Sequence, residues 1–299
     1  MLKIAIIAGE PSGDMLASKL MHELKQQSDQ PINFFGIGGD KMALEGLDSE
    51  YPMSTLSVMG YFDVIKSLIP ILKVRSGIID KIIEFKPDVF IGIDAPDFNF
   101  YVEKKLKEHG IKTVHYISPT IWAWRYERIF KIKKSTDLVL CIFPMEEPLY
   151  KAENIQAKFV GHPLADQIEF NVDTRSYKER LHLSGTVFTI LVGSRIREIN
   201  NLSTIFIETC NLIKQSIPNA TFLFPFTNRA THDLFFSYLA SMKVNFKYQL
   251  LIDQTSYAIK ASDMVLAKSG TVTLEVALSQ KPLIISYKIS KIMEWLLKR

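Results

Sequence analysis

The opening stretch MLKIAIIAGEPSGDMLASKLMHEL, residues 1–24, carries the pattern that decides the fold. An apolar run over Leu2–Ala8 predicts a buried β-strand, which ends at the polar turn Gly9–Asp14. After the turn, Leu16, Leu20 and Leu24 recur four residues apart, as on one face of an amphipathic helix. A near-continuous apolar strand that leads directly into a helix is typical of a parallel sheet covered on both faces.

The same alternation of strand and helix continues along the chain. The first series of predicted strands comprises Leu2–Ala8, Asn33–Ile37, Val89–Ile93, Thr113–Ile117, Leu138–Phe143 and Lys158–Val160. The second series comprises Phe188–Val192, Thr221–Phe224, Phe246–Leu251, Met264–Ala267 and Leu283–Tyr287. Helices are expected over residues 199–217 and 271–278. We therefore expect two doubly wound α/β domains, residues 1–168 and 185–299, which a polar linker (residues 169–184) joins and which face each other across a cleft.

The composition is that of an ordinary globular chain. Of 299 residues, 47% are hydrophobic and 23% charged, and the net charge of +4 is too small to indicate nucleic-acid binding. Cys141 lies in an apolar run, where a buried thiol is expected, and no Cys/His spacing suits zinc. No apolar window approaches the roughly 20 residues of a membrane span, and the first apolar run is too short for a signal peptide. These features favour a cytoplasmic location.

Carboxylates follow two of the strands predicted in the first half. Asp94 comes directly after Val89–Ile93, and Glu10 lies in the turn after the first strand. Ligands of such sheets bind at the carboxyl ends of the strands, where a carboxylate can act as general base towards an alcohol or accept hydrogen bonds from sugar hydroxyls. Helix capping is the alternative. We favour helix capping for Asp97 and catalysis for Asp94. For Asp14 we leave capping and a functional role equally open.

Two strand-to-helix turns in the second half are suited to phosphate. The turn containing Arg195 places a guanidinium beside a helix N-terminus, and the turn before Thr271 offers hydroxyl and backbone donors at the start of another helix. Glu275 follows one helical turn later on the same face, from which it could accept both ribose hydroxyls of a nucleotide. These turns indicate a nucleotide-sugar donor. The predicted donor-side residues are Ser194, Arg195, Ser269, Gly270, Thr271 and Glu275.

Two further segments favour contact with a lipid. Residues 56–79 are strongly apolar with scattered charges, which suits a helix lying on a membrane or a pocket for acyl chains. Two tryptophans precede a basic cluster, which we define as Arg125, Arg128, Lys131, Lys133 and Lys134. Aromatic and basic side chains together suit a membrane interface or a phosphate-bearing headgroup. The alternative for residues 56–79 is a buried core helix. The alternative for the tryptophans and the basic cluster is a packed aromatic core with a solvated basic helix face. The predicted acceptor and membrane residues are Met59, Phe62, Trp122, Trp124 and Arg125.

Taken together, the motifs resemble those of the lipid-A-disaccharide synthases. They follow one another in that family's order and cover nearly the whole chain. The matching segments are Ala8–Asp14, Lys86–Asp88, Gly92–Phe98, His115–Pro119, Trp122–Arg125, Gly161–Pro163, Gly193–Arg195 with Glu198, and Ser269–Thr271 with Thr273–Glu275.

The resemblance implies a GT-B fold of two Rossmann-like domains and an inverting hexosyl transfer without metal or other cofactor. The implied donor is UDP-2,3-diacylglucosamine and the acceptor is 2,3-diacylglucosamine 1-phosphate. The products would be lipid A disaccharide 1-phosphate and UDP, on the inner face of the cytoplasmic membrane of a Gram-negative bacterium. Asp94 matches the family's base and Glu10 a carboxylate important to activity. Arg195 matches the donor-side arginine, and Glu275 the ribose contact.

The sequence departs from the family at two places. Val192 stands where the family usually has proline, and the chain stops at Arg299, where the resemblance implies further residues that finish the second domain. We therefore expect the chain as given to be poorly active alone. One rival interpretation is an inactive or partner-requiring UDP-binding fragment, whose partner could be a second copy of the chain. The other is another UDP-sugar glycosyltransferase or an epimerase of the same fold. The incomplete glycine pattern over Gly36–Asp40 argues against a Rossmann dehydrogenase.

Overall fold

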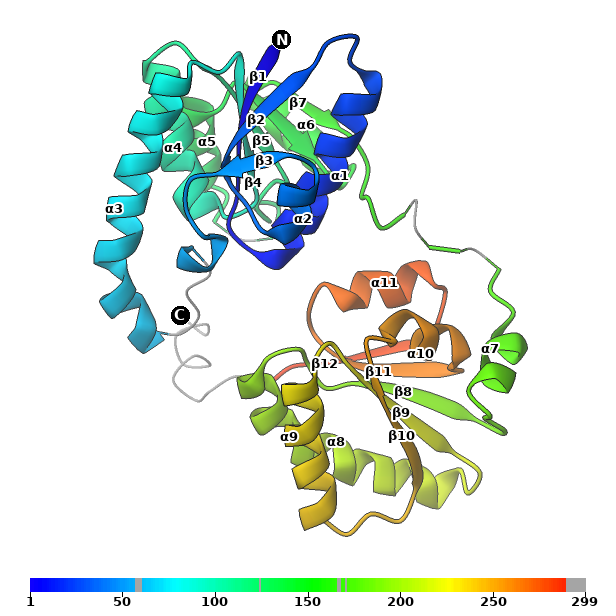
Figure 1. The fold of residues 1–299 in the computed structure, drawn as a ribbon. Helices are drawn as coiled ribbons and strands as arrows, with labels where there is room; N and C mark the ends of the chain where they lie inside the picture. Colours follow the sequence, from blue (N-terminus) through cyan, green and yellow to red (C-terminus); the bar gives the residue numbers. More distant parts are fainter. Residues whose placement is uncertain (57–60, 124, 166–167, 170, 289–299) are drawn as a thin grey trace. The chain divides into compact units, whose positions relative to one another are not determined.

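The computed structural model describes residues 1–56, 61–123, 125–165, 168–169 and 171–288, with the side chains of residues 61–69 excepted. Contacts divide the chain into two units, Met1–Pro163 and Leu164–Arg299 (Figure 1). Each unit has its own parallel sheet and its own hydrophobic core. The arrangement is α/β, as the alternation of strands and helices predicts.

The described part of the first unit holds a seven-stranded sheet in the order β3-β2-β1-β4-β5-β6-β7, and every neighbouring pair is parallel. Its strands are β1 (Leu2–Ala8), β2 (Ile32–Ile37), β3 (Leu47–Ser49), β4 (Val89–Ile93), β5 (Lys112–Tyr116), β6 (Leu138–Cys141) and β7 (Ala157–Phe159). Its helices are α1 (Pro11–Gln27), α2 (Asp40–Leu44), α3 (Tyr61–Phe85), α4 (Pro96–Glu108), α5 (Arg128–Ser135) and α6 (Glu146–Ala152).

The packing of β1 explains why its sequence is apolar at every position after Lys3. Ile4 and Ile6 pack into the core beneath α1, whereas Ala5 and Ile7 pack into the core beneath α3 and α4. Successive side chains of a strand point to opposite faces, so a strand covered by helices on both sides needs no polar residue. Figure 1 shows α1 and α2 on one side of this sheet and α3 and α4 on the other.

The second unit repeats this architecture over a smaller sheet. Within the described residues its five strands are ordered β10-β9-β8-β11-β12 and are parallel. They are β8 (Val187–Leu191), β9 (Thr221–Phe226), β10 (Lys247–Ile252), β11 (Met264–Lys268) and β12 (Leu283–Ser286). The helices are α7 (Thr174–Arg180), α8 (Ile196–Ser216), α9 (Arg229–Ser241), α10 (Thr255–Ala261) and α11 (Val272–Leu278). Helices α8 and α9 cover one face, and α10 and α11 the other (Figure 1).

The predicted strands all appear, with ends that differ from the prediction by at most two residues. The structure adds β3, whose three residues (Leu47–Ser49) include two polar ones and so form no apolar run. Residues 169–184, expected to be a linker, hold α7, whose Tyr177 ring packs edge-on against Tyr257 of α10 at 5.3 Å. Cys141 and Cys210 are buried free thiols. Among the described helices, none is long and apolar enough to cross a bilayer.

Each sheet contains one place where the strand order reverses. The first unit proceeds from β1 to β2 on one side and to β4 on the other; the second proceeds from β8 to β9 on one side and to β11 on the other. Loops that leave such adjacent strands in opposite directions open a crevice at the carboxyl ends, which is where doubly wound sheets bind ligands. The two switch points are therefore the first places to examine for a site.

Candidate functional site

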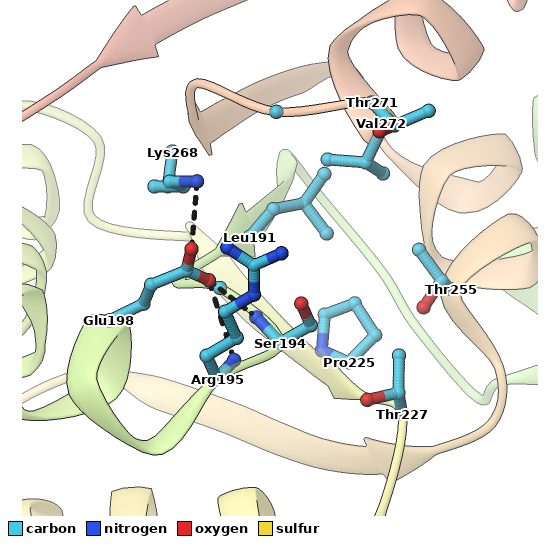
Figure 2. Close-up of a pocket in the computed structure, with 12 residues that line it drawn as sticks. Leu191, Ser194, Arg195, Glu198, Pro225, Thr227, Thr255, Lys268, Thr271 and Val272 are labelled. Carbon is cyan, nitrogen blue, oxygen red and sulfur yellow. Dashed lines mark hydrogen bonds and ion pairs between the residues drawn. The ribbon is translucent and has the colours of Figure 1, made fainter. Parts of the chain in front are cut away.

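A cavity of about 450 Å³ lies at the switch point of the second unit, at the carboxyl ends of β8, β9 and β11 (Figure 2). A cavity of this size is within the usual range for small-molecule sites. It is lined by Leu191, Gly193, Ser194, Arg195, Glu198, Pro225, Thr227, Thr255, Lys268, Gly270, Thr271 and Val272.

A glycine makes the first wall of the cavity possible. Gly193 has a φ of +139°, and a Cβ atom added there would lie 2.6 Å from the Cβ of Glu198. Only glycine fits this close approach. The carboxylate of Glu198 consequently sits beneath the turn, where it accepts hydrogen bonds from the backbone N–H of Ser194 (3.0 Å) and Arg195 (3.4 Å). The turn that carries Arg195 is thus held by a side chain from the first turn of α8.

An ion pair joins this turn to the neighbouring strand. Lys268, the last residue of β11, places its Nζ 2.8 Å from Oε1 of Glu198, and both side chains are largely buried. Figure 2 shows the Arg195 guanidinium directed into the cavity beside this pair. Two cations against one carboxylate leave the site net positive, and the start of α8 adds the positive end of a helix dipole. This arrangement suits an anion with more than one charge, such as a diphosphate.

The pKa of Glu198 is set by opposing effects. Burial favours the protonated form, but the hydrogen bond from Lys268, the N–H of Ser194 and the charges of Lys268 and Arg195 outweigh it and lower the pKa. A carboxyl whose pKa is lower in the folded state stabilises the fold above its unfolded pKa, and this contribution is lost as the pH falls through the folded pKa. The ion pair therefore stabilises the cavity at neutral pH.

We expect Glu198→Gln to lower the free energy of unfolding of the second unit by about 1–2 kcal/mol at pH 7, because it removes a charge-assisted hydrogen bond. The difference from the unchanged protein should be smaller at pH 3 than at pH 7, because the contribution of the ion pair is lost as the pH falls towards the lowered pKa of Glu198. Urea unfolding at both pH values measures this. Glu208→Gln, an exposed change on the same helix, is the control and should show no loss at either pH. An equal loss for Glu198→Gln at both pH values would contradict the ion-pair explanation.

The cavity brings together most of the predicted donor-side residues. Ser194, Arg195, Gly270 and Thr271 line it, although they come from turns more than 70 residues apart. Ser269 and Glu275 are not among the described residues that line it. Burial raises the pKa of Glu275, against the opposing charge of Lys260. The roles of all six residues stay predictions.

Sequence reasoning gave no role to several residues of this cavity. Glu198 stands in a quoted motif and Lys268 directly precedes one, but their pairing joins segments about 70 residues apart and leaves no local signal. Thr227 and Thr255 were missed altogether. Thr227 directly follows β9, so the rule that ligands bind where parallel strands end would have found it.

Two carboxylates meet at the switch point of the first unit. Ala8 pairs with Ile93, so Glu10 and Asp94 leave the sheet from adjacent strands at the same edge. A Cβ added to Gly9 would lie 3.1 Å from the Cβ of Ala95, which shows how closely the two turns approach. Glu10 is exposed at the N-cap of α1, and Asp94 is half-buried.

The capping prediction for Asp97 is wrong. The helix α4 has Ala95 at its N-cap, and the Asp97 side chain is 92% exposed with its carboxylate 3.7 Å from Arg128. Pro96 occupies the first helical position, as its fixed φ favours, so Asp97 comes too late to cap.

Asp14 caps a helix other than its own. Its buried carboxylate accepts hydrogen bonds from the N–H of Gly39 (2.8 Å), Lys41 (3.2 Å) and Met42 (3.1 Å), at the start of α2. The N–H of Gly39 in the glycine turn and those of the two residues at the start of α2 are therefore taken by a carboxylate, whose negative charge would repel a phosphate. This explains the partial glycine fingerprint without a dinucleotide.

The predicted lipid-side residues are only partly described. Met59 and Trp124 lie outside the described residues, as does the side chain of Phe62. Trp122 is 47% exposed, so it is no core residue, and Arg125 is exposed. In α3, Val74, Ile78, Ile79 and Ile82 are buried, so this end of the apolar segment is a core helix. Within the described ranges, no cluster of three or more His, Cys, Asp or Glu residues could hold a metal ion.

Comparison with known proteins identifies a family. The family described as lipid-A-disaccharide synthetase matches residues 4–299. A lipid-A-disaccharide synthase from Chromobacterium violaceum is 44% identical over 301 residues, which cover 100% of this chain and 78% of that protein. The synthase from Dechloromonas aromatica is 42% identical, with 100% of this chain and 79% of that protein covered.

Solved structures resemble the fold at low sequence identity. The S. aureus MnaA–UDP co-structure superposes with a TM-score of 0.66 at 13% identity, covering 99% of this chain and 82% of that one. UDP-GlcNAc 2-epimerase from Neisseria meningitidis bound to UDP-GlcNAc gives a TM-score of 0.64 at 13% identity, covering 99% and 85%. At these identities the likeness concerns the fold alone.

Proposed function

The chain belongs to the lipid-A-disaccharide synthase family, and from this premise we propose its reaction and the residues that perform it. It is a hexosyltransferase of GT-B fold, with one Rossmann-like sheet in each unit. The proposed reaction transfers 2,3-diacylglucosamine from UDP-2,3-diacylglucosamine to 2,3-diacylglucosamine 1-phosphate. The observation that carries the proposal is the net positive cavity at the switch point of the second unit.

In the proposed donor complex, the diphosphate of UDP lies in this cavity. Arg195 would bind a phosphate through its planar guanidinium, and Lys268 would supply a second positive charge near the leaving oxygen. The hydroxyls of Ser194 and Thr271 are further donors at its rim. Charge develops on the departing UDP as the glycosidic bond breaks, so fixed cations at this point stabilise the transition state more than the ground state.

The acceptor chemistry is assigned to the first unit. The carboxylate of Asp94 takes the proton of the acceptor's primary hydroxyl, whose oxygen attacks the anomeric carbon of the donor. A new carbon–oxygen bond forms with inversion as the bond to the UDP oxygen breaks, and UDP leaves with the electron pair. Glu10, on the adjacent turn, accepts hydrogen bonds from sugar hydroxyls and helps to orient the acceptor. The shared sheet edge of the two carboxylates supports this assignment.

The test of the reaction is a turnover assay of the purified chain with both diacylated substrates. Formation of lipid A disaccharide 1-phosphate together with UDP supports the proposal. Incubation with UDP-GlcNAc alone tests epimerisation, the activity named for several proteins of similar fold. Epimer formation without disaccharide would overturn the proposed function. UDP binding without either product would indicate a fragment that binds the donor but does not turn over.

We further propose that the first unit binds an anionic membrane surface through the basic cluster and the exposed Trp122. Lys131 and Lys134 are exposed on α5, and each basic residue near such a surface contributes about 1 kcal/mol. Changing both to glutamine should therefore weaken binding to anionic liposomes by roughly thirtyfold at low salt. Co-sedimentation measures this, and salt should weaken binding without abolishing it because the apolar contact remains.

The matched control changes two exposed lysines of the second unit, Lys243 and Lys247, to glutamine. An equal loss of liposome binding in the control would mean that net charge, and not this cluster, drives the association. Failure of the unchanged protein to sediment with anionic liposomes at low salt would rule the membrane proposal out.

A further inference from the structure

The backbone that presents Asp94 has an unusual conformation. Asp94 and the next residue, Ala95, have φ values of 49° and 43°, and two consecutive left-handed residues that carry a Cβ atom are unfavourable. The N–H of Asp94 donates to the carbonyl of Tyr116 (2.9 Å). The carbonyl oxygens of Ile93 and Asp94 accept hydrogen bonds from a side chain of α4. Such a turn persists only where its surroundings hold it.

The side-chain amide of Asn99, one turn into α4, supplies that support. It is fully buried, and its Nδ2 donates to the carbonyl oxygens of Asp94 (2.9 Å) and Ile93 (3.2 Å). A longer hydrogen bond of 3.5 Å reaches the carbonyl of Ile7 in β1. The amide therefore connects the two strands that part at the switch point, and it does so directly behind Asp94.

The buried amide of Asn99 requires a glycine next to it and leaves its own oxygen without a partner. Gly92 precedes Asp94 by two residues, and a Cβ atom there would lie 3.0 Å from the Cβ of Asn99 and 2.3 Å from Oε1 of Glu103. Glu103 in turn contacts Nδ1 of His115 at 2.6 Å and holds the next turn of α4 against β5. Oδ1 of Asn99 is one of three buried side-chain atoms, among the described residues, that have no hydrogen-bond partner. A buried acceptor left unpaired is unfavourable. The favourable part of this amide is therefore its donor group, which binds the backbone carbonyls of the turn.

We propose that Asn99 is a positioning residue for Asp94: its amide fixes the left-handed turn and thereby aims the Asp94 carboxylate at the acceptor hydroxyl. The inference rests on the proposed role of Asp94. Asn99→Ser, which shortens the side chain and withdraws the donor, should lower kcat by roughly 10- to 100-fold, the scale of a misplacement of about 1 Å. The affinity for UDP should not change, because the cavity with Arg195 belongs to the other unit.

The deciding experiment is a double-mutant cycle of Asn99→Ser and Asp94→Asn, with kcat measured by a radiolabelled assay that detects slow turnover. If Asn99 acts through Asp94, Asn99→Ser lowers kcat when Asp94 is present, but lowers kcat little further in the Asp94→Asn background. An equal loss in both backgrounds, or a normal kcat for Asn99→Ser, would overturn the inference. Asn99→Leu, which keeps a similar volume and removes the donor, replaces Asn99→Ser in the cycle if the serine variant does not fold.

A control separates positioning from general destabilisation. Thr113 is fully buried at the amino end of β5, and its hydroxyl donates to the carbonyl of Ser135 at 3.0 Å. Thr113→Val removes a buried hydrogen bond of the same unit far from the carboxyl edge, so it should lower the melting temperature without lowering kcat. If Asp94→Asn alone keeps normal turnover, the role of Asp94 fails; if it is slow while Asn99→Ser is normal, only the inference about Asn99 fails.

Discussion

Asp94→Asn is expected to lower the kcat of disaccharide formation by about 10²–10⁴-fold, the usual contribution of a well-placed general base. The amide keeps the size of the carboxylate and cannot accept the proton of the attacking hydroxyl. Asp94 follows β4 at the switch point, beside the turn that carries Glu10. The donor cavity lies in the other unit, so the affinity for UDP should stay unchanged. Steady-state kinetics with both diacylated substrates measure kcat, and calorimetry measures UDP binding.

Asp97→Asn provides the matched control for this experiment. Asp97 lies three residues further on, is 92% exposed and makes only a long ion pair of 3.7 Å with Arg128 among its described interactions. A proton acceptor is removed in both variants, but only Asp94 lies at the end of the strand. A kcat for Asp94→Asn equal to that of Asp97→Asn would show that Asp94 is not the base.

Arg195→Ala should weaken UDP binding by roughly 10- to 150-fold, because a hydrogen bond to a charged group contributes about 1.5–3 kcal/mol. The backbone at Arg195 is held by Glu198, so removal of the guanidinium should leave the turn itself intact. Arg195→Lys should recover part of the affinity, since it keeps the charge and loses the planar, two-pronged geometry. Calorimetric titration with UDP gives the dissociation constants directly.

Arg197→Ala is the control, because Arg197 is exposed on the same helix and does not line the cavity. Both changes remove one positive charge from the start of α8. A similar loss of UDP affinity in the two variants would mean that the general field of the helix start binds the nucleotide. An unchanged affinity of Arg195→Ala for UDP would show that this cavity is not the donor site.

The architecture could be predicted from the sequence because its causes are local. The run Leu2–Ala8 is apolar at every position except Lys3, a pattern typical of a strand covered on both sides, and the structure covers it on both sides. The donor-side turns were also predictable. Arg195 and Thr271 each follow a predicted parallel strand, and parallel strands end at one edge of a sheet, so both turns could be placed at the same edge. That they line one cavity depends on β8 and β11 being neighbours, which the structure shows.

Only the tertiary structure decided which partners the polar residues take. Asp14 looks like a cap for its own helix, yet its carboxylate binds the start of α2, 25 to 28 residues away. Lys268 and Glu198 become partners because β8 and β11 are neighbours, which nothing in either segment indicates.

The sequence by itself therefore determined the two parallel sheets, the order of their elements and the turns that carry the proposed chemistry. The tertiary structure decided that Asn99 supports Asp94, that Glu198 supports Arg195, and that Asp97 supports neither. The physical reason is the range of the forces involved. Hydrophobic periodicity and turn conformation act over a few neighbouring residues, whereas a hydrogen bond between distant residues forms only after the packing of whole strands and helices has brought its two atoms within about 3 Å.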